Sequence, residues 1–355
     1  MVERYAYPIV RYDDFRAAVT PLDPIEDASS WIASLRSQEY TSDVLRVVHE
    51  FKRNADIKRL ARTIQTYSDN ALSFLHQAYS GRARVSYLPL YYAILNLSKI
   101  TILSNGLEKQ LLDQRYHGAA YKPQSKDSHG LLTDTVQIHS GGALPLLYRS
   151  LVGEAVGFSK RLFNLRQFYP LVTGIQHEFS QAFKLPDPRQ IFKIEIVKLN
   201  NGRYVLEAKG NNCKHPNANK LRYLKALREF KSVSRNIFRS PSVAAINANE
   251  AAIDLCKYLR RELFYEPTLN LERDMITGIN LPISSSNFLM PEEIPIWIAF
   301  FHISCVVRYK PEFLDRLENS KCWPVLLVLR KHAIFRYLML FWSNFHKCNY
   351  SIYVR

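Results

Sequence analysis

The sequence contains little of what marks several protein classes. Only 12 glycines and 5 cysteines occur among 355 residues, and no two cysteines form a CxxC pair. The low glycine content excludes collagen-like chains and glycine-rich low-complexity chains. An odd number of scattered cysteines is typical of free thiols in a reducing compartment. We therefore predict a globular cytoplasmic protein that needs neither disulfides nor a bound metal or other cofactor.

Long apolar runs are also missing. The longest run extends from Ile294 to Val307 and ends at Arg308, whereas a membrane-spanning helix needs about 20 apolar residues. The N-terminal segment contains Glu3 and Asp13 and has no unbroken apolar stretch, unlike a signal peptide. The sequence therefore predicts a buried core helix at the long run and no membrane span.

Acidic residues are scarce relative to basic ones. The chain has 48 Lys and Arg against 32 Asp and Glu, so its formal net charge is +16. Such an excess favours polyanionic partners, either nucleic acid or an acidic protein. Hydrophobic residues make up 47% of the chain, which is enough for a sizeable core.

Helical spacing of apolar residues dominates the chain and predicts a mostly α fold. The exception is a stretch in which Phe192, Ile194 and Ile196 alternate with polar residues. An Asn-Asn-Gly turn and a second alternating stretch follow, which predicts a β-hairpin. We predict four parts: an N-terminal arm at 1–40, a helical bundle at 41–185, the β-hairpin plus a basic helix at 186–240, and a C-terminal helical part at 241–355 that packs back on the bundle.

The predicted helix after the hairpin, at 220–239, has the most one-sided charge. At 100° per residue, its apolar side chains share one face and its basic side chains share another. The basic face consists of Lys220, Lys225, Arg228, Lys231, Arg235 and Arg239. Such a stripe can follow the phosphates of a nucleic acid or contact an acidic protein. The alternative is that it is the solvated face of a basic protein.

A second candidate site surrounds the hairpin. Asp187 precedes it, and Glu207 and Lys209 are separated by one residue on its second strand. This arrangement resembles metal-dependent nucleases, in which two carboxylates hold Mg²⁺ and the lysine steadies the attacking water or the scissile phosphate. The alternative interpretation is a solvent-facing hairpin without chemistry.

A polar segment at 116–139 contains three histidines, His117, His129 and His139. A histidine in a loop is suited to general-base catalysis. However, no Ser/His/Asp or Cys/His set can be assigned from the spacing, and structural or capping roles are the alternative.

Three segments resemble the bacterial YaaC-like family. They are YYAILNLSK, the SHGL motif that contains His129 and Gly130, and the segment PEEIPIWIAFFHISCVVRYKPEF. The family's late L-S-M-x-x-R-Y-x-P segment is similar to residues 303–311, with Cys305 in place of methionine and with Arg308 and Tyr309 matched. The resemblance spans residues 40–345 and implies a shared fold without naming a reaction.

The YYAILNLSK helix also resembles the paired helices of HEPN domains, which occur in nucleotide-binding proteins and ribonuclease toxins. Catalytic members have four to six residues between an Arg and a following His, and no histidine of this chain has an Arg five to seven positions before it. The resemblance therefore implies a HEPN-like bundle that binds or scaffolds without cleaving RNA, in a bacterial stress or phage-defence system.

These observations give one main hypothesis and two alternatives. The main hypothesis is a non-catalytic protein that contacts nucleic acid or an acidic protein through the basic helix. The first alternative is the Mg²⁺-dependent nuclease described above. The second alternative is a structural subunit whose aromatic C-terminal helices form a partner interface. Those aromatic residues are Trp297, Phe300, Phe301, Tyr337, Phe341 and Trp342.

Overall fold

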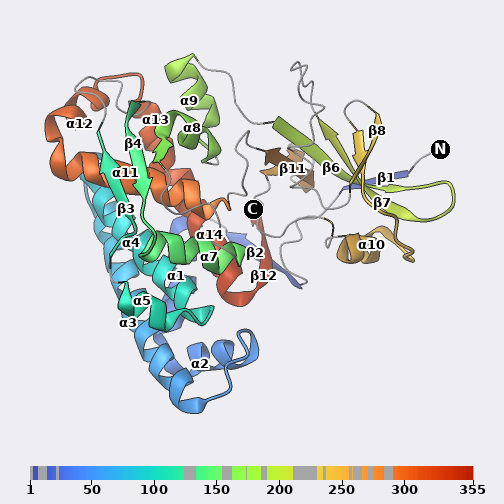
Figure 1. Cartoon of the computed structure of the whole chain (residues 1–355), viewed down its shortest axis with the longest axis horizontal. Coiled ribbons are helices and arrows are strands. Elements are labelled where there is room, and N and C mark those ends of the chain that lie inside the picture. The colour runs from blue at the N-terminus through green and yellow to red at the C-terminus, as the bar shows by residue number, and fades with distance from the viewer. Residues whose placement is uncertain are drawn as a thin grey trace. The chain divides into compact units, whose positions relative to one another are not determined.

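The structure is a computed structural model, and its elements are labelled in Figure 1. It describes residues 3–6, 14–20, 24–114, 116–123, 133–153, 162–172, 174–184, 190–210, 230–234, 237–255, 258, 266–270, 275–283 and 291–354. The chain divides into two compact units. The helical unit consists of residues 22–187 and 291–347, and the strand unit consists of residues 1–21, 188–290 and 348–355. The C-terminal helices thus belong to the same unit as the N-terminal bundle.

Helices make up most of the helical unit, and the described chain as a whole is mostly helical. The helices are α1 (Pro24–Ala33), α2 (Gln38–Val47), α3 (Asn54–Ser80), α4 (Ala83–Ser104), α5 (Glu108–Asp113), α7 (Ala143–Val152), α8 (Leu165–Phe168), α9 (Gln176–Phe183), α11 (Glu293–Tyr309), α12 (Pro311–Glu318), α13 (Trp323–Val328) and α14 (Ile334–His346). A small antiparallel sheet accompanies them, with the order β3 (Ala119–Lys122), β4 (Thr135–Ile138) and β5 (Leu162–Asn164).

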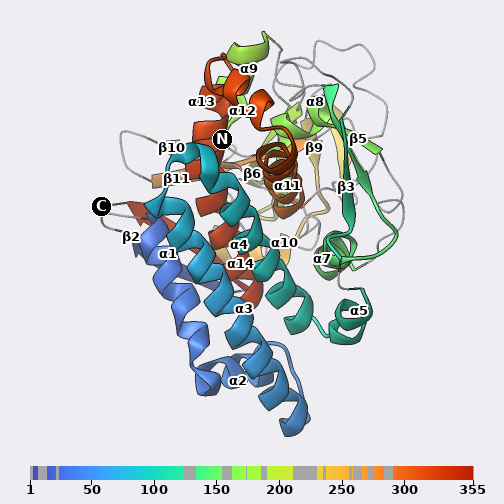
Figure 2. The same cartoon turned by 90° about the vertical axis from the view of Figure 1, so that its left-hand side faces the viewer.

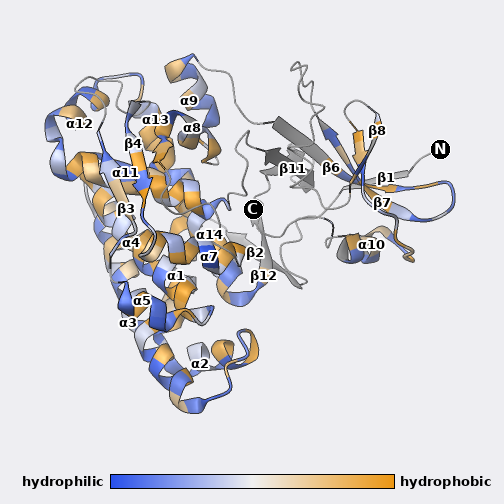
Figure 3. Ribbon diagram, viewed as in Figure 1, coloured by the Kyte–Doolittle hydropathy of each residue, from blue (hydrophilic) through white to orange (hydrophobic). Residues whose placement is uncertain are grey.

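The long helices α3 and α4 form an antiparallel pair and lie side by side (Figure 2). Ile57, Leu60 and Ile64 are buried on one face of α3, so hydrophobic and hydrophilic residues alternate along this helix in Figure 3. By contrast, α4 is buried nearly all round because it packs against α3, α7, α11 and α14. The helix α4 begins at Ala83 and ends at Ser104. Pro89 lies inside the helix, where packing on several sides offsets the lost backbone hydrogen bond.

The helix α11 confirms the buried core helix predicted at the longest apolar run. Its residues from Glu293 to Val306 are all buried, and it packs along α4. The six aromatic side chains proposed as a partner interface are also buried within this chain, each at most 7% exposed. They therefore form core, and a partner cannot reach them. None of the helices in the described ranges is both long and apolar enough to cross a membrane.

The strand unit contains a seven-stranded sheet with the order β10-β11-β6-β7-β9-β8, in which β1 also pairs with β6. Its strands are β1 (Glu3–Ala6), β6 (Gln190–Lys198), β7 (Tyr204–Gly210), β8 (Lys231–Ser234), β9 (Ile237–Arg239), β10 (Glu266–Asn270) and β11 (Met275–Ile283). The helix α10 (Ala248–Leu255) packs against β6 and β7. In addition, β2 (Asp14–Thr20) and β12 (Cys348–Val354) form a parallel pair.

The hairpin predicted from the alternating pattern is confirmed as β6 and β7. Gly202 closes the turn with a φ of 78°, and its N–H donates to the Leu199 carbonyl at 2.9 Å. A positive φ of this kind favours glycine because a Cβ atom would be strained there. Instead of standing as an isolated insertion, the hairpin forms the middle of the larger sheet.

The basic helix predicted at 220–239 is wrong over its described second half. Residues from Lys231 onward form the short strands β8 and β9, and β9 pairs with β7 so that Arg239 lies opposite Glu207. The helical spacing of apolar residues in this segment is overridden by pairing with a strand that is distant in sequence. Residues 211–229 and 235–236 lie outside the described residues.

Candidate functional site

The sheet brings several predicted site residues together on one face. Glu195, Glu207, Arg239 and Lys231 lie opposite one another on β6, β7, β9 and β8. The Glu207 side chain is fully buried, and the Arg239 guanidinium contacts one of its oxygens through Nε at 2.8 Å and Nη2 at 2.7 Å. Lys209 Nζ lies 3.7 Å from Glu207 and 3.8 Å from Glu195. These cations compensate the buried carboxylate, as a buried charge requires.

This arrangement differs from the predicted nuclease site in one respect. The strand register places Glu195, and not Asp187, directly opposite Glu207, and Asp187 itself lies outside the described residues. Within the ranges that the structure describes, no group of three or more His, Cys, Asp or Glu side chains could hold a metal ion. The Mg²⁺ site with Asp187, Glu207 and Lys209 therefore stays a prediction.

Most of the predicted basic stripe also lies outside the described residues, namely Lys220, Lys225, Arg228 and Arg235. Of the two members that are described, Lys231 is exposed on β8, while Arg239 is engaged by Glu207. His129 and Gly130 of the SHGL motif likewise lie outside the described residues.

The other two family-motif residues, Arg308 and Tyr309, lie at the last turn of α11. Arg308 is anchored to its own helix, because Nε donates to the Ser304 carbonyl at 3.3 Å and Nη2 lies 3.7 Å from Cys305 Sγ. The guanidinium lies 5.1 Å from the centre of the Tyr309 ring, and that ring is 67% exposed. Arg308 makes no ion pair with a carboxylate of the described chain. The result is an exposed aromatic ring beside an uncompensated positive charge.

Buried Tyr91 and half-buried His117 form a hydrogen-bonded pair that packs against Phe301 of α11. The Tyr91 hydroxyl lies 2.7 Å from His117 Nδ1. Burial raises the pKa of Tyr91 well above its usual value, and burial together with the charges of Arg308 and Lys99 lowers the pKa of His117. Two cations close enough to suppress protonation of His117 create a local positive potential. Such a potential favours an anion.

A buried hydrogen-bond network connects β3 and the residue before β4 to α11 and Tyr169. The Tyr121 hydroxyl donates to Asp134, His302 Nε2 lies 3.5 Å from the same carboxylate, and His302 Nδ1 lies 2.9 Å from the Tyr169 hydroxyl. Burial lowers the pKa of His302, although Asp134 opposes this effect. Lys310 lies above the Tyr121 ring, 5.4 Å from its centre. The network thus fixes β3 and β4 against α11.

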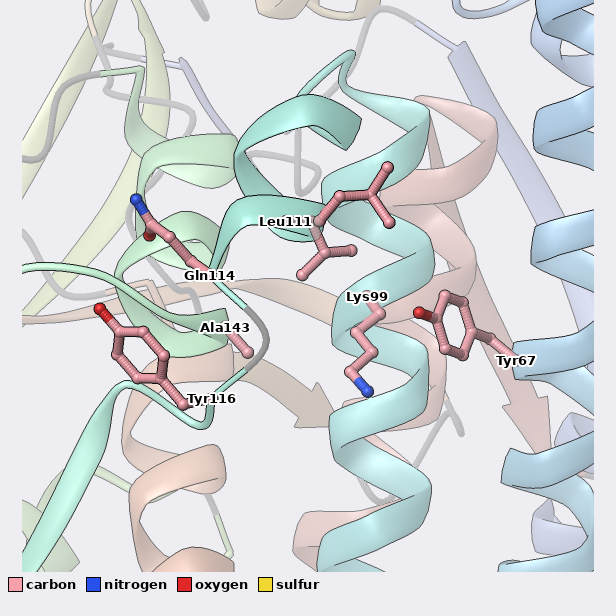
Figure 4. Close-up of a pocket in the computed structure, with 7 residues that line it drawn as sticks. Tyr67, Lys99, Leu111, Gln114, Tyr116 and Ala143 are labelled. Carbon is pink, nitrogen blue, oxygen red and sulfur yellow. The ribbon is translucent and has the colours of Figure 1, made fainter.

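A cavity of about 250 Å³ lies beside α4, and Tyr116, the residue before His117, forms part of its wall (Figure 4). Its lining residues are Tyr67, Lys99, Leu111, Leu112, Gln114, Tyr116 and Ala143. Lys99 is the single charged side chain among them. Its ammonium lies 5.0 Å from the centre of the Tyr67 ring, and burial lowers its pKa. No carboxylate lines the cavity.

Backbone contacts hold the opposite wall of this cavity in place. Gln114 Oε1 accepts a hydrogen bond from the Gly142 N–H at 2.8 Å, and the Ala143 N–H donates to the Tyr116 carbonyl at 2.9 Å. Gly142 has a φ of 101°, and a Cβ atom there would lie 2.6 Å from the Gly118 backbone. The glycine therefore permits the close approach that forms the wall.

Sequence reasoning missed Lys99, although a signal was present. It is the single charged residue of the apolar stretch from Leu88 to Leu107, and a charge in an otherwise apolar helix needs a specific reason. Glu195 was also missed, because only the register of the sheet places it opposite Glu207.

Comparison with models of known protein families shows to which family the chain belongs. The model of the YaaC-like protein family matches residues 33–328. This chain belongs to the YaaC-like family. The match includes Lys99, His117 and the Arg308–Tyr309 pair, so the YaaC-like region contains the whole cationic region described above. Searches among curated proteins and among solved structures gave no significant match.

Proposed function

We propose that this YaaC-like protein binds single-stranded nucleic acid through the end of α11. The contact surface, which we call the Arg308 surface, consists of Arg308, Tyr309 and Lys310. The observation that carries the proposal is the Arg308 guanidinium, which has no carboxylate partner in the described chain and lies beside the exposed Tyr309 ring. An exposed aromatic ring can stack on a base, while a neighbouring cation contacts the phosphate.

The surrounding charges support this proposal. Lys310 adds a second cation, which lies over the Tyr121 and Phe313 rings. Of the acidic residues of α12, Asp315 and Glu318 face Arg84, and Glu312 is exposed and forms no ion pair with Arg308 in the described chain. Together with the formal net charge of +16, this favours a polyanion. The exposed ring favours nucleic acid over an acidic protein, since bases offer flat faces to stack on.

The proposal keeps the predicted partner but changes the residues that bind it. The basic stripe predicted on a helix at 220–239 does not form over residues 231–234 and 237–239, because these residues are strands. In addition, Arg239 forms an ion pair with Glu207. The antiparallel pair of α3 and α4 is compatible with a HEPN-like bundle, which we include in the proposal together with a role in bacterial stress or phage defence. No catalytic step is part of it.

Binding of a fluorescent single-stranded oligoribonucleotide that lacks terminal phosphates, measured by anisotropy over a range of salt concentrations, tests the proposal. We expect Arg308→Ala to weaken binding about tenfold and to reduce the slope of log K against log salt by about 1. Tyr309→Ala should weaken binding by a similar factor without changing the slope, because stacking releases no counterions.

Arg62→Ala is the matched control. Arg62 is exposed on α3, so this substitution removes the same charge from another helix of the same unit. Equal losses for Arg62→Ala and Arg308→Ala would show a diffuse attraction to the basic protein and would contradict a defined Arg308 surface. An oligodeoxyribonucleotide of the same sequence, measured in parallel, shows which nucleic acid the protein prefers.

A further inference from the structure

The cavity beside Lys99 is separate from the Arg308 surface in its chemistry. It is partly enclosed, measures about 250 Å³ and offers a single ammonium group among tyrosine, glutamine and leucine side chains. Figure 4 shows Lys99 between Tyr67 on one side and Gln114, Tyr116 and Ala143 on the other. Lys99 forms no ion pair with any described carboxylate, and its described contact is the Tyr67 ring.

We infer that this cavity receives a terminal phosphate monoester of the bound strand. This inference rests on the proposed function and adds which part of the strand is recognised. A volume of 250 Å³ corresponds to about eight waters at 30 Å³ each. That space accommodates a phosphate group with a small part of its sugar. Because the cavity is partly enclosed, it favours the end of a strand over an internal phosphodiester, whose chain must leave the cavity in two directions.

Charge points to the same ligand. A phosphate monoester carries a charge of about −1.5 to −2 near pH 7, whereas an internal phosphodiester carries −1. Lys99 supplies an ammonium in surroundings without competing carboxylates, and a charge-assisted hydrogen bond there is stronger than one in bulk water. The neutral lining lets a single lysine determine the preference for the more highly charged group.

Position connects the cavity to the Arg308 surface. The helix α4, which carries Lys99, packs along α11, which ends at Arg308 and Tyr309, and the ring centre of His117 lies 6.4 Å from that of Phe301 on α11. Tyr116, the residue before His117, lines the cavity. A strand whose bases stack at Tyr309 can thus direct its end past His117 to Lys99 without leaving the helical unit.

The test compares three oligoribonucleotides of one sequence, with a 5′-phosphate, a 3′-phosphate or no terminal phosphate. We expect one of the phosphorylated forms to bind wild-type protein about tenfold more tightly than the unphosphorylated form. Lys99→Met removes the charge but keeps the apolar stem over the Tyr67 ring, and it should abolish this preference while leaving the affinity for the unphosphorylated strand unchanged. Lys109→Met, on exposed Lys109 of α5, should retain the preference, and thermal denaturation confirms that both variants fold.

The outcomes separate the two proposals. If all three strands bind wild-type protein equally, the terminal-phosphate inference is overturned and the proposed function stands. If no strand binds, the proposed function fails as well. Weaker binding of phosphorylated and unphosphorylated strands alike in Lys99→Met would overturn the inference too, since Lys99 would then contribute only general charge.

Discussion

Two groups of cations, one in each unit of this protein, differ in how their charges are compensated, although other cations of the helical unit, such as Arg336 beside Glu292, are paired. In the strand unit, Arg239 forms an ion pair with Glu207, and Lys209 lies 3.7 Å from Glu207 and 3.8 Å from Glu195. Carboxylates of the same sheet therefore compensate both positive charges. In the helical unit, Arg308 and Lys99 form no ion pair with a described carboxylate and instead lie beside tyrosine rings. Net charge alone therefore does not locate a binding surface, because what matters is which cations remain uncompensated.

The contrast follows from the local architecture. Adjacent strands place side chains of neighbouring residues about 5 Å apart, which favours pairing of opposite charges across the sheet. The end of α11 offers Arg308 only its own helix and Tyr309, and the cavity beside α4 offers Lys99 only neutral groups. The charges of Arg239 and Lys209 thus serve stability, whereas those of Arg308 and Lys99 are available for a ligand.

The largest expected effect concerns the compensated charges. Glu207→Ala leaves Arg239 and Lys209 without their buried partner, and breaking such a pair costs about 3 kcal/mol. We expect a lower free energy of unfolding in chemical denaturation. Glu195→Gln is the control on the neighbouring strand, and because Glu195 is partly exposed (14%) it should cost less. A loss for Glu207→Ala no larger than for the control would contradict the structural role of the buried carboxylate.

A smaller loss of folding stability is expected when the pH is lowered, and it arises from histidines of the helical unit. Burial lowers the pKa of His49 to about 4 and also lowers the pKa values of His117 and His302. Below the usual histidine pKa of about 6.5, the unfolded chain therefore binds protons that the folded chain does not, so stability falls as pH decreases. For His49 the loss develops between about pH 6.5 and 4, and it amounts to about 2 kcal/mol between pH 6.5 and pH 5 at about 1.4 kcal/mol per pH unit.

Denaturation midpoints at pH 7 and pH 5 measure this effect. His49 donates from Nε2 to the Phe345 carbonyl at 2.8 Å, so His49→Gln keeps a donor but removes the titrating group. This variant should lose less stability between the two pH values than the wild type. A wild-type midpoint that is the same at both values would contradict the neutral buried histidines.

Elements whose signal is local were predictable from the sequence. The hairpin of β6 and β7 followed from alternation and a glycine turn, and the buried α11 followed from an apolar run ended by Arg308. The basic helix at 220–239 was not predictable as the strands β8 and β9, because their partner β7 is a distant segment. A 3.6-residue apolar spacing does not reveal such a partner.

Some residues of the candidate site could likewise be selected from the sequence, and others could not. Arg308 and Tyr309 could be selected from their family motif, and His117 from its polar loop. The cavity could not be anticipated, because α3, α4, α5 and α7 each contribute part of its lining. Lys99 stands out in the sequence as a lone charge in an apolar helix, but the absence of a nearby carboxylate is a property of the packed structure.

Hydrogen exchange with and without a saturating single-stranded oligoribonucleotide tests the central contrast most directly. We predict that amides of residues 116–123 and 304–313, in the helical unit, exchange more slowly when the strand is bound, while amides of β6 and β7 exchange at unchanged rates. Protection confined to β6–β9, with none at the end of α11, would contradict the account and assign nucleic-acid binding to the strand unit.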